Sequence, residues 1–277
     1  MSELVMNESG FQLAMHQASL YEGQSAVFMA PSANLMVDAM DLQRGDQVLD
    51  LACGTGLVAR AARRVVGTDG RVVGADLNPA MLAVANSIEP EIEWLQAPAD
   101  RLPLDDEAFT HVACQQGFQF FPHASAAAAE AFRVLRPHGR LVATVWATPG
   151  HNPYIETQLA ILAELDATVA ESARTATPVK ADEMMVGVAS DAGFTEINVS
   201  LLEHTVEVAD VEAFFLSQTA STPWAPVIAM FTADELQILA GMFAARLKAP
   251  GAASGGYLLR FASHMLIARK EPFDELS

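Results

Sequence analysis

Short apolar runs alternate with amphipathic segments through the first half of the chain. Five runs of strand length recur, at residues 48–51, 71–75, 92–96, 111–115 and 141–146. Short buried strands separated by helices are typical of βαβ units, in which a parallel sheet is covered on both faces. The pattern therefore predicts an α/β fold built on a doubly wound, mostly parallel sheet.

The segments between these runs carry apolar residues at helical spacing, at 57–65, 78–87 and 123–135. The second of them begins with Asn78 and Pro79, which are favoured at the N-cap and at the first helical position.

The first 45 residues precede this alternation and are predicted to form a helical lid. Helices are expected at 11–20 and at 32–40, with Ser32 as the N-cap of the second. The segment 21–31 between them has turn residues and aromatic residues without a period. A core domain is then predicted over 46–150.

The remainder, 151–277, has a different rhythm. Helices are predicted at 152–170 and 182–192, strands at 195–208 and 257–268, and a long helical stretch at 211–248. The last two strands bring the sheet to seven. The helical block of about 208–250 interrupts them and suits a substrate cap.

Charge and composition exclude several classes of function. Acidic residues outnumber basic ones by 34 to 16, which gives a net charge of −18. That field repels nucleic acids and anionic membranes, so no nucleic-acid partner is expected. No run approaches the roughly 18 apolar residues of a membrane span. The N-terminus lacks the features of a signal peptide, and neither cysteines nor histidines show metal-ligand spacing. A cytoplasmic protein without a metal site is expected.

A glycine-rich loop follows the first strand. Gly54, Gly56 and Ala59 form the pattern G-x-G-x-x-A, which brings backbone N–H groups to a ligand at a helix N-terminus. Asp76 ends the second strand, 22 residues after Gly54, where a carboxylate can accept both hydroxyls of a ribose. Its alternative role is to cap the next helix.

Asp50 lies four residues before the first glycine and helps to decide which of two kinds of ligand the loop binds. A loop built for pyrophosphate gains nothing from a carboxylate at its mouth, because like charges repel. A carboxylate there suits an ammonium or a sulfonium. Alternatively, Asp50 only bonds loop amides, which still shapes the pocket.

Four stretches together resemble a known family. They are VLDLACGTG, GRVVGADLNPAMLAVA, LPLDDEAFTHVACQQGFQFFPH and AFRVLRPHGRLVATVW, and they span about residues 47–146. In this order they resemble the class I S-adenosylmethionine-dependent methyltransferases, in the small-molecule branch that includes the ubiquinone/menaquinone-biosynthesis enzymes. The resemblance implies a Rossmann-like seven-stranded sheet and S-adenosylmethionine as cofactor. It also implies methyl transfer by in-line displacement to an O, N or C atom of a small-molecule acceptor.

The same resemblance implies roles for individual residues around the cofactor. The methionyl pocket would be lined by Asp50, Ala52, Gly54, Thr55 and Gly56. Asp76 would bind the ribose, Leu77 would pack on the adenine, and Gln115 and Gln116 would hydrogen-bond the cofactor.

The adenine-reading pair departs from the family pattern. An Asp or Asn followed by Ala is usual there, whereas this chain has Pro98 and Ala99. Proline has no side-chain acceptor, so the usual bond to the adenine amino group is in doubt. Ala99 can still offer its backbone N–H. Asp100 is either the substitute carboxylate or a solvent residue beside Arg101.

The residues that would contact the methyl acceptor are less well defined by the sequence. Methyl transfer needs a general base only when the acceptor carries a proton that it does not release at neutral pH. His151 and Tyr21 are the favoured candidates for that base, ahead of His16, His123 and His264. Phe28, Phe120 and Trp224 are candidate walls of the acceptor pocket.

The sequence leaves two questions open. One is the role of the segments rich in aromatic residues and methionine, and the other is the activity itself. These segments, 10–31 and 211–248, would either enclose the acceptor or bury a homodimer interface. The rival activities are an NAD-dependent oxidoreductase, from the same glycine pattern, and a cofactor-binding protein that does not methylate.

Overall fold

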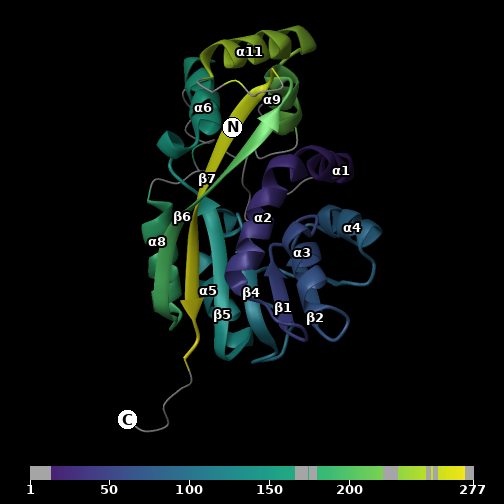
Figure 1. The fold of residues 1–277 in the computed structure, drawn as a ribbon, viewed down its shortest axis with the longest axis vertical. Coiled ribbons are helices and arrows are strands. Elements are labelled where there is room, and N and C mark those ends of the chain that lie inside the picture. Colours follow the sequence, from purple (N-terminus) through teal and green to yellow (C-terminus); the bar gives the residue numbers. More distant parts are fainter. Residues whose placement is uncertain are drawn as a thin grey trace.

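A seven-stranded sheet forms the centre of the chain in the computed structural model, which describes residues 14–165, 174, 180–220, 230–247, 251 and 255–271 (Figure 1). The strand order is β3-β2-β1-β4-β5-β7-β6. Neighbours from β3 to β5 pair in parallel, and β7 runs antiparallel to both β5 and β6. The strands are β1 (Gln47–Leu51), β2 (Arg71–Asp76), β3 (Glu93–Gln96), β4 (Phe109–Gln115), β5 (Leu135–Trp146), β6 (Thr195–Val208) and β7 (Tyr257–Arg269). The predicted mostly parallel, seven-stranded sheet is confirmed.

Helices cover both faces of this sheet because successive strand residues point to opposite sides. Val48 packs in the core beneath α2 (Ala26–Met40) and α3 (Leu57–Val66). Its neighbour Leu49 packs in the core beneath α5 (Ala124–Val134) and α8 (Ala181–Asp191). At the β2–β3 end lies α4 (Pro79–Ile88), which contacts α1 (Met15–Gln24). Apolar residues on both sides of each strand therefore hold a three-layer arrangement.

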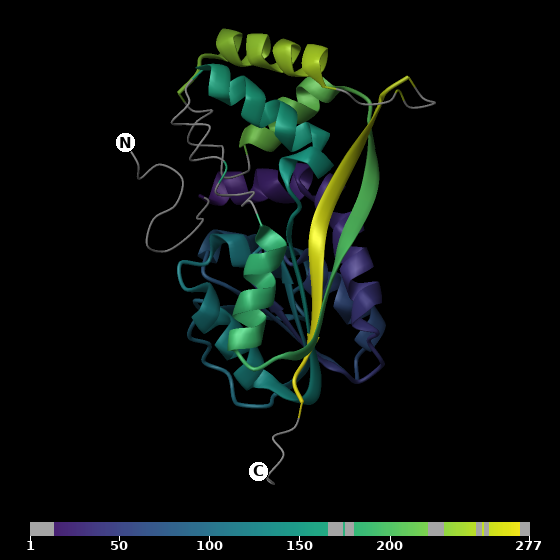
Figure 2. The same cartoon turned by 90° about the vertical axis from the view of Figure 1, so that its left-hand side faces the viewer.

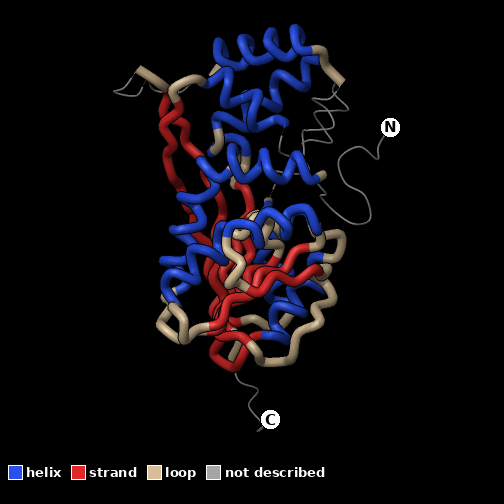
Figure 3. The backbone as a smooth tube through the Cα atoms, turned by 90° about the vertical axis from the view of Figure 1, so that its right-hand side faces the viewer, coloured by secondary structure: helices blue, strands red, loops and turns tan. Residues whose placement is uncertain are grey.

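A helical cap stands beyond one end of the sheet. It consists of α6 (Pro153–Leu165), α9 (Val211–Ala220) and α11 (Ala233–Arg246), and the long strands β6 and β7 reach up to it (Figure 3). Its core is rich in aromatic side chains, including Tyr154, Phe215 and Phe243. The N-terminal helix α1 lies between the cap and the sheet (Figure 2).

The predicted start of the second helix at Ser32 is wrong. The helix α2 begins at Ala26 and continues through Pro31, and Ser32 is buried inside it. A proline at this position removes one backbone hydrogen bond. The helix persists because its first turns bury Phe28 and Met29, and such packing contributes more than the lost bond.

Other boundaries also differ from the prediction. β5 begins at Leu135 rather than at residue 141, and Leu135 pairs with Phe109 across an irregularity in the β4–β5 register. The predicted helix at 211–248 is represented by α9 and α11, while residues 221–229 lie outside the described part. The same holds for the predicted helix ends at 11–13 and 166–170.

Two further features of the described residues concern membrane spans and metal sites. None of the helices in the described ranges combines the length and the hydropathy of a membrane span. Within the same ranges, no three His, Cys, Asp or Glu side chains gather in a way that could hold a metal ion.

Candidate functional site

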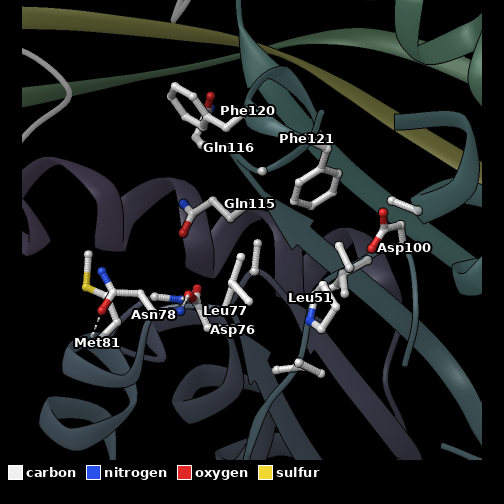
Figure 4. Close-up of a pocket in the computed structure, with 18 of the residues that line it drawn as sticks. Leu51, Asp76, Leu77, Asn78, Met81, Asp100, Gln115, Gln116, Phe120 and Phe121 are labelled. Carbon is white, nitrogen blue, oxygen red and sulfur yellow. Dashed lines mark hydrogen bonds between the residues drawn. The ribbon is translucent and has the colours of Figure 1, made fainter. Parts of the chain in front are cut away.

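A cavity of about 330 Å³ lies at the carboxyl ends of the parallel strands (Figure 4). Leu51, Asp76, Gln115 and Trp146 line it, and they stand at or near the ends of β1, β2, β4 and β5. In open α/β sheets this edge is where ligands bind. The cavity is also lined by Tyr21 of α1, so the N-terminal segment covers it.

Asp76 anchors the glycine loop to the end of β2. Its Oδ2 accepts a hydrogen bond from the Gly54 N–H at 2.8 Å, and its Oδ1 accepts one from the Asn78 N–H at 2.8 Å. Gly54 has a φ of +54°, a conformation that glycine adopts without the cost of a Cβ. A carboxylate offers about four acceptor sites, so Asp76 keeps capacity for a ligand in the cavity that it lines.

The cap of α4 is made by Asn78 rather than by Asp76. The Asn78 side chain accepts from the Ala80 N–H at 2.9 Å and from the Met81 N–H at 3.4 Å. Burial raises the pKa of the Asp76 carboxyl, whereas the backbone bonds from Asn78 and Gly54 lower it. The alternative that Asp76 serves only as a helix cap therefore loses its main support.

Asp50 does not line the cavity, contrary to its expected place in the methionyl pocket. Its side chain is buried, and its Oδ2 accepts from the Ala59 N–H in the first turn of α3 at 2.8 Å. Burial, with a smaller contribution from Asp76, raises the pKa of Asp50 to about 7. Of the two roles predicted for Asp50, the bond to a local amide is the one observed.

The glycine pattern has a packing cause as well. Gly56 has a φ of +84°, and a Cβ there would lie 2.3 Å from Cη2 of Trp94. Neither Gly56 nor the buried Thr55 lines the cavity, whereas Ala52 and Gly54 do. Gly56 therefore makes room for an indole ring instead of approaching a ligand.

Next to Asp76, the cavity is bounded by a short turn over residues 97–101, here called the 97–101 turn; it begins at Ala97, whose N–H donates to the Asp76 carbonyl. Pro98, Ala99 and Asp100 all line the cavity, and Leu77 lies between them and Asp76 in sequence and also lines it. The turn is closed by the Arg101 N–H, which donates to the Pro98 carbonyl at 3.2 Å. The predicted departure from the family pattern thus falls on the cavity wall itself.

Gln115 and Gln116 also line the cavity and connect it to neighbouring elements. Gln115 Nε2 donates to the Met29 carbonyl at 3.0 Å, which ties α2 to the end of β4. Gln116 Nε2 donates to the Ser263 hydroxyl at 2.8 Å. Both amide nitrogens are therefore engaged within the protein.

Aromatic rings form the wall nearest the cap. Phe28 and Trp146 stack with centroids 6.1 Å apart and planes 21° from parallel, and Phe28 also stacks on Phe261 at 5.0 Å. Phe28, Trp146 and Phe120 line the cavity. Trp224, the third predicted wall residue, lies outside the described residues.

The two candidate bases differ in their position relative to the cavity. Tyr21 lines the cavity, and burial together with the charge of Asp76 raises its pKa, so its hydroxyl stays protonated and can only donate or accept a hydrogen bond. His151 does not line the cavity; its side chain is exposed, and its Nδ1 lies 3.1 Å from the Thr148 hydroxyl. His123, at the N-terminus of α5, does line it.

Sequence reasoning missed several wall residues. Asn78, Met81 and Pro122 line the cavity. For Asn78 and Met81 a signal existed, because the Asn78–Pro79 helix start follows directly on the carboxylate strand. Met29 lies in the segment 10–31, which is predicted to enclose the acceptor, and it lines the cavity, although this segment forms α1 and α2 and is not irregular over 21–31.

Comparisons with known proteins agree with this geometry. Residues 49–143 match a family described as a methyltransferase domain. A ubiquinone/menaquinone biosynthesis C-methyltransferase of Psychromonas ingrahamii is 36% identical over 123 residues, which are 42% of this chain and 49% of the relative. The corresponding enzyme of Cronobacter sakazakii is 31% identical over 179 residues, 58% of this chain and 71% of the relative. The match thus spans about half of the first relative's length and over two thirds of the second's.

Among solved structures, a proposed methyltransferase from Bacillus halodurans has a TM-score of 0.58 at 22% identity. The likeness covers 87% of this chain and 99% of that one. At this level of identity it supports the fold.

Proposed function

Because this chain belongs to the class I S-adenosylmethionine-dependent methyltransferases, we propose that its cavity holds S-adenosylmethionine with the ribose at Asp76. The adenine then lies between Leu77 and the 97–101 turn, and the methionine end lies toward Ala52, Gly54 and Tyr21. The observation that carries this arrangement is the Asp76 carboxylate, which is fixed by two backbone N–H groups and still faces the cavity.

The residues present fit this cofactor better than a dinucleotide. A pyrophosphate needs free N–H groups at the glycine loop and the helix N-terminus. Here the Gly54 N–H is taken by Asp76 and the Ala59 N–H by Asp50. No Lys or Arg belongs to the described wall of the cavity. The carboxyl groups of Asp76 and Asp100 on this wall, without a Lys or Arg beside them, disfavour a pyrophosphate and tolerate an ammonium or a sulfonium.

S-adenosylmethionine, when bound, supplies a methyl group attached to a sulfonium, and the sulfur becomes a neutral thioether when the methyl group is transferred. The protein then has to align the acceptor and exclude water. Tyr21 and Phe28 extend over the cavity from α1 and α2, and Trp146 closes the side beneath the cap. With its raised pKa, Tyr21 serves as a hydrogen-bond partner that orients a ligand, not as a base.

The same wall restricts the acceptor. Phe28, Trp146 and Phe120 offer apolar ring surface, the carboxyl groups that line the described cavity are those of Asp76 and Asp100, and no Lys or Arg lines it. A carboxylate or phosphate on the acceptor would be desolvated there without a cationic partner, which is costly. We therefore propose a small acceptor that carries no negative charge, is uncharged or cationic, and is methylated at O, N or C.

Calorimetric titration tests the cofactor assignment. S-adenosylmethionine and S-adenosylhomocysteine should bind, and NAD should give no detectable heat. Equal or tighter binding of NAD would overturn the assignment and favour an oxidoreductase.

Acceptor pairs that differ only in charge test the acceptor class. 3,4-Dihydroxybenzamide and 3,4-dihydroxybenzoate, each offered with methyl-labelled S-adenosylmethionine, form one such pair, because the amide and the carboxylate are nearly equal in size. The uncharged member should be methylated at least about tenfold faster, as expected for a penalty of roughly 1.4 kcal/mol. Faster methylation of the carboxylate would contradict the proposal.

A further inference from the structure

Hydrogen bonds hold the 97–101 turn in place at both of its ends. None of these bonds comes from a side chain that lines the cavity. At its front end, the Ala97 N–H donates to the Asp76 carbonyl at 3.1 Å, an extension of the β2–β3 pairing. At its back end lies Leu102, which is 5% exposed. Leu102 has both of its backbone groups bonded to side chains of α5.

Two residues of α5 hold that back end. Glu130 Oε2 accepts from the Leu102 N–H at 2.6 Å. The Arg133 guanidinium donates to the Leu102 carbonyl at 3.0 Å and to the Leu104 carbonyl at 2.8 Å. A single helix face thus grips three backbone groups of the segment that leaves the turn.

Glu130 and Arg133 also hold each other rigidly. Arg133 Nε donates to Glu130 Oε1 at 2.7 Å, and Arg133 Nη2 donates to Glu130 Oε2 at 2.9 Å. This two-pronged geometry fits the planar fork of arginine and not the single ammonium of lysine. The side chains are 31% and 18% exposed. The fork is therefore partly shielded from water, unlike the outer contact of Arg133 to the 74% exposed Asp106.

The position of this turn matters more in this chain because residue 98 is proline. Without a side-chain acceptor there, the edge of a bound base meets only backbone groups of Ala99 and the side chain of Asp100. Backbone recognition depends on where the backbone is held. A displacement of the turn by a fraction of an ångström would misplace every donor and acceptor it offers.

We propose that Arg133 and Glu130 are positioning residues for adenine: they fix the 97–101 turn through Leu102 and Leu104 without touching the ligand. This inference rests on the proposed function, since it assumes that the base lies at that turn. It separates adenine recognition from the methionine end of the cavity, which the clamp does not contact.

The test uses Arg133→Lys in the full chain and two ligands. S-adenosylhomocysteine contains adenosine and the amino-acid part, whereas 5′-methylthioadenosine keeps the adenosine and lacks the amino-acid part. Arg133→Lys should weaken both by the same factor, about tenfold, because the clamp acts only on the shared end. The matched control is Arg136→Lys. Arg136 donates to the Glu107 and Ala108 carbonyls at 3.0 and 3.3 Å, farther along the same connection and away from the cavity. It should leave both affinities unchanged.

Amide hydrogen exchange of the ligand-free protein supplies a second readout. Arg133→Lys should accelerate exchange over residues 97–104 and leave the glycine loop protected. If Arg133→Lys does not fold, Glu130→Gln replaces it, with a smaller loss expected for both ligands. Unchanged affinity in a variant whose wild-type parent binds would overturn the positioning role alone. Failure of the wild-type protein to bind either ligand would overturn the proposed function and the adenine role with it.

Discussion

The two ends of the cavity are built on different principles. At the end where we propose that the ribose binds, here called the ribose end, one side chain, Asp76, both organises the glycine loop and faces the cavity. At the 97–101 turn, the wall offers mainly backbone, and its position is set by Arg133 and Glu130 about 30 residues farther along the chain. A carboxylate at the end of a strand can be recognised in the sequence. A cavity wall made of backbone, whose position is set by residues far along the chain, cannot be recognised in this way.

This difference extends to charge. The ribose end contains two buried or partly buried carboxylates, Asp50 and Asp76, each bonded to backbone N–H groups. The turn carries Asp100, for which no such bond is formed by the described residues. The ribose end should therefore respond to pH and to substitution more strongly than the turn does.

The largest effect is expected for Asp50→Asn, on the pH dependence of stability. In the folded protein the pKa of Asp50 is about 7, whereas an unfolded aspartate titrates near 3.9. Between these values the folded state holds a proton that the unfolded state has released. Stability contributed by this group is therefore lost as pH rises, at about 1.4 kcal/mol per unit.

Urea denaturation of both proteins from pH 5 to pH 8 measures this contribution. The wild-type protein should lose about 3 kcal/mol relative to Asp50→Asn over that interval, because the asparagine oxygen can still accept from Ala59 and does not titrate. Asp69→Asn, at a side chain that is 73% exposed, is the control. Parallel curves for wild type and Asp50→Asn would mean that Asp50 titrates normally.

Asp76→Ala should give the next largest effect, on cofactor affinity. Loss of a carboxylate that accepts two ribose hydroxyls should cost about 2–4 kcal/mol, or roughly 30- to 1000-fold in the dissociation constant. Asp76→Asn, which keeps one acceptor, should fall between wild type and alanine. A change of less than about threefold in Asp76→Ala, measured by titration calorimetry, would assign Asp76 to the glycine loop alone.

At the turn, Asp100→Ala should have a smaller effect. If Asp100 replaces the acceptor that Pro98 lacks, the dissociation constant of S-adenosylhomocysteine should rise about tenfold, which corresponds to roughly 1.4 kcal/mol. Asp105→Ala is the matched control, since Asp105 is exposed on the same connection and does not line the cavity. Equal affinities of the two variants would show that backbone contacts of Ala99 suffice.

Much of the fold follows from local patterns in the sequence. The strands are short apolar runs, and the start of α4 is fixed by Asn78 and Pro79, whose cap bonds are the ones expected. Local patterns fail where distant packing decides. Pro31 lies inside α2 because Phe28 and Met29 are buried against other elements, and no local rule anticipates that.

The candidate site shows the same division. Spacing predicts a ligand role for Asp76 and Gly54, the family resemblance implies one for Ala52, and all three residues line the cavity. Gly56 matched the same spacing, yet it accommodates Trp94 from a strand 38 residues away. Arg133 lies within one of the stretches that resemble the family, and no sequence pattern indicates a role for it, because its contacts are to backbone carbonyls of another segment.

The smallest effect is expected for His151, which sequence position alone placed beside the acceptor. Its side chain is exposed and does not line the cavity, whereas His123 does. His151→Gln should therefore leave methyl transfer within about twofold of wild type, as surface substitutions usually do. His123→Gln is the informative partner, because it changes a side chain of the cavity wall that lies outside the sheet. Turnover should be compared across pH 6 to 9 with a saturating acceptor. A loss of the acidic limb of the profile in His151→Gln alone would restore His151 as the general base.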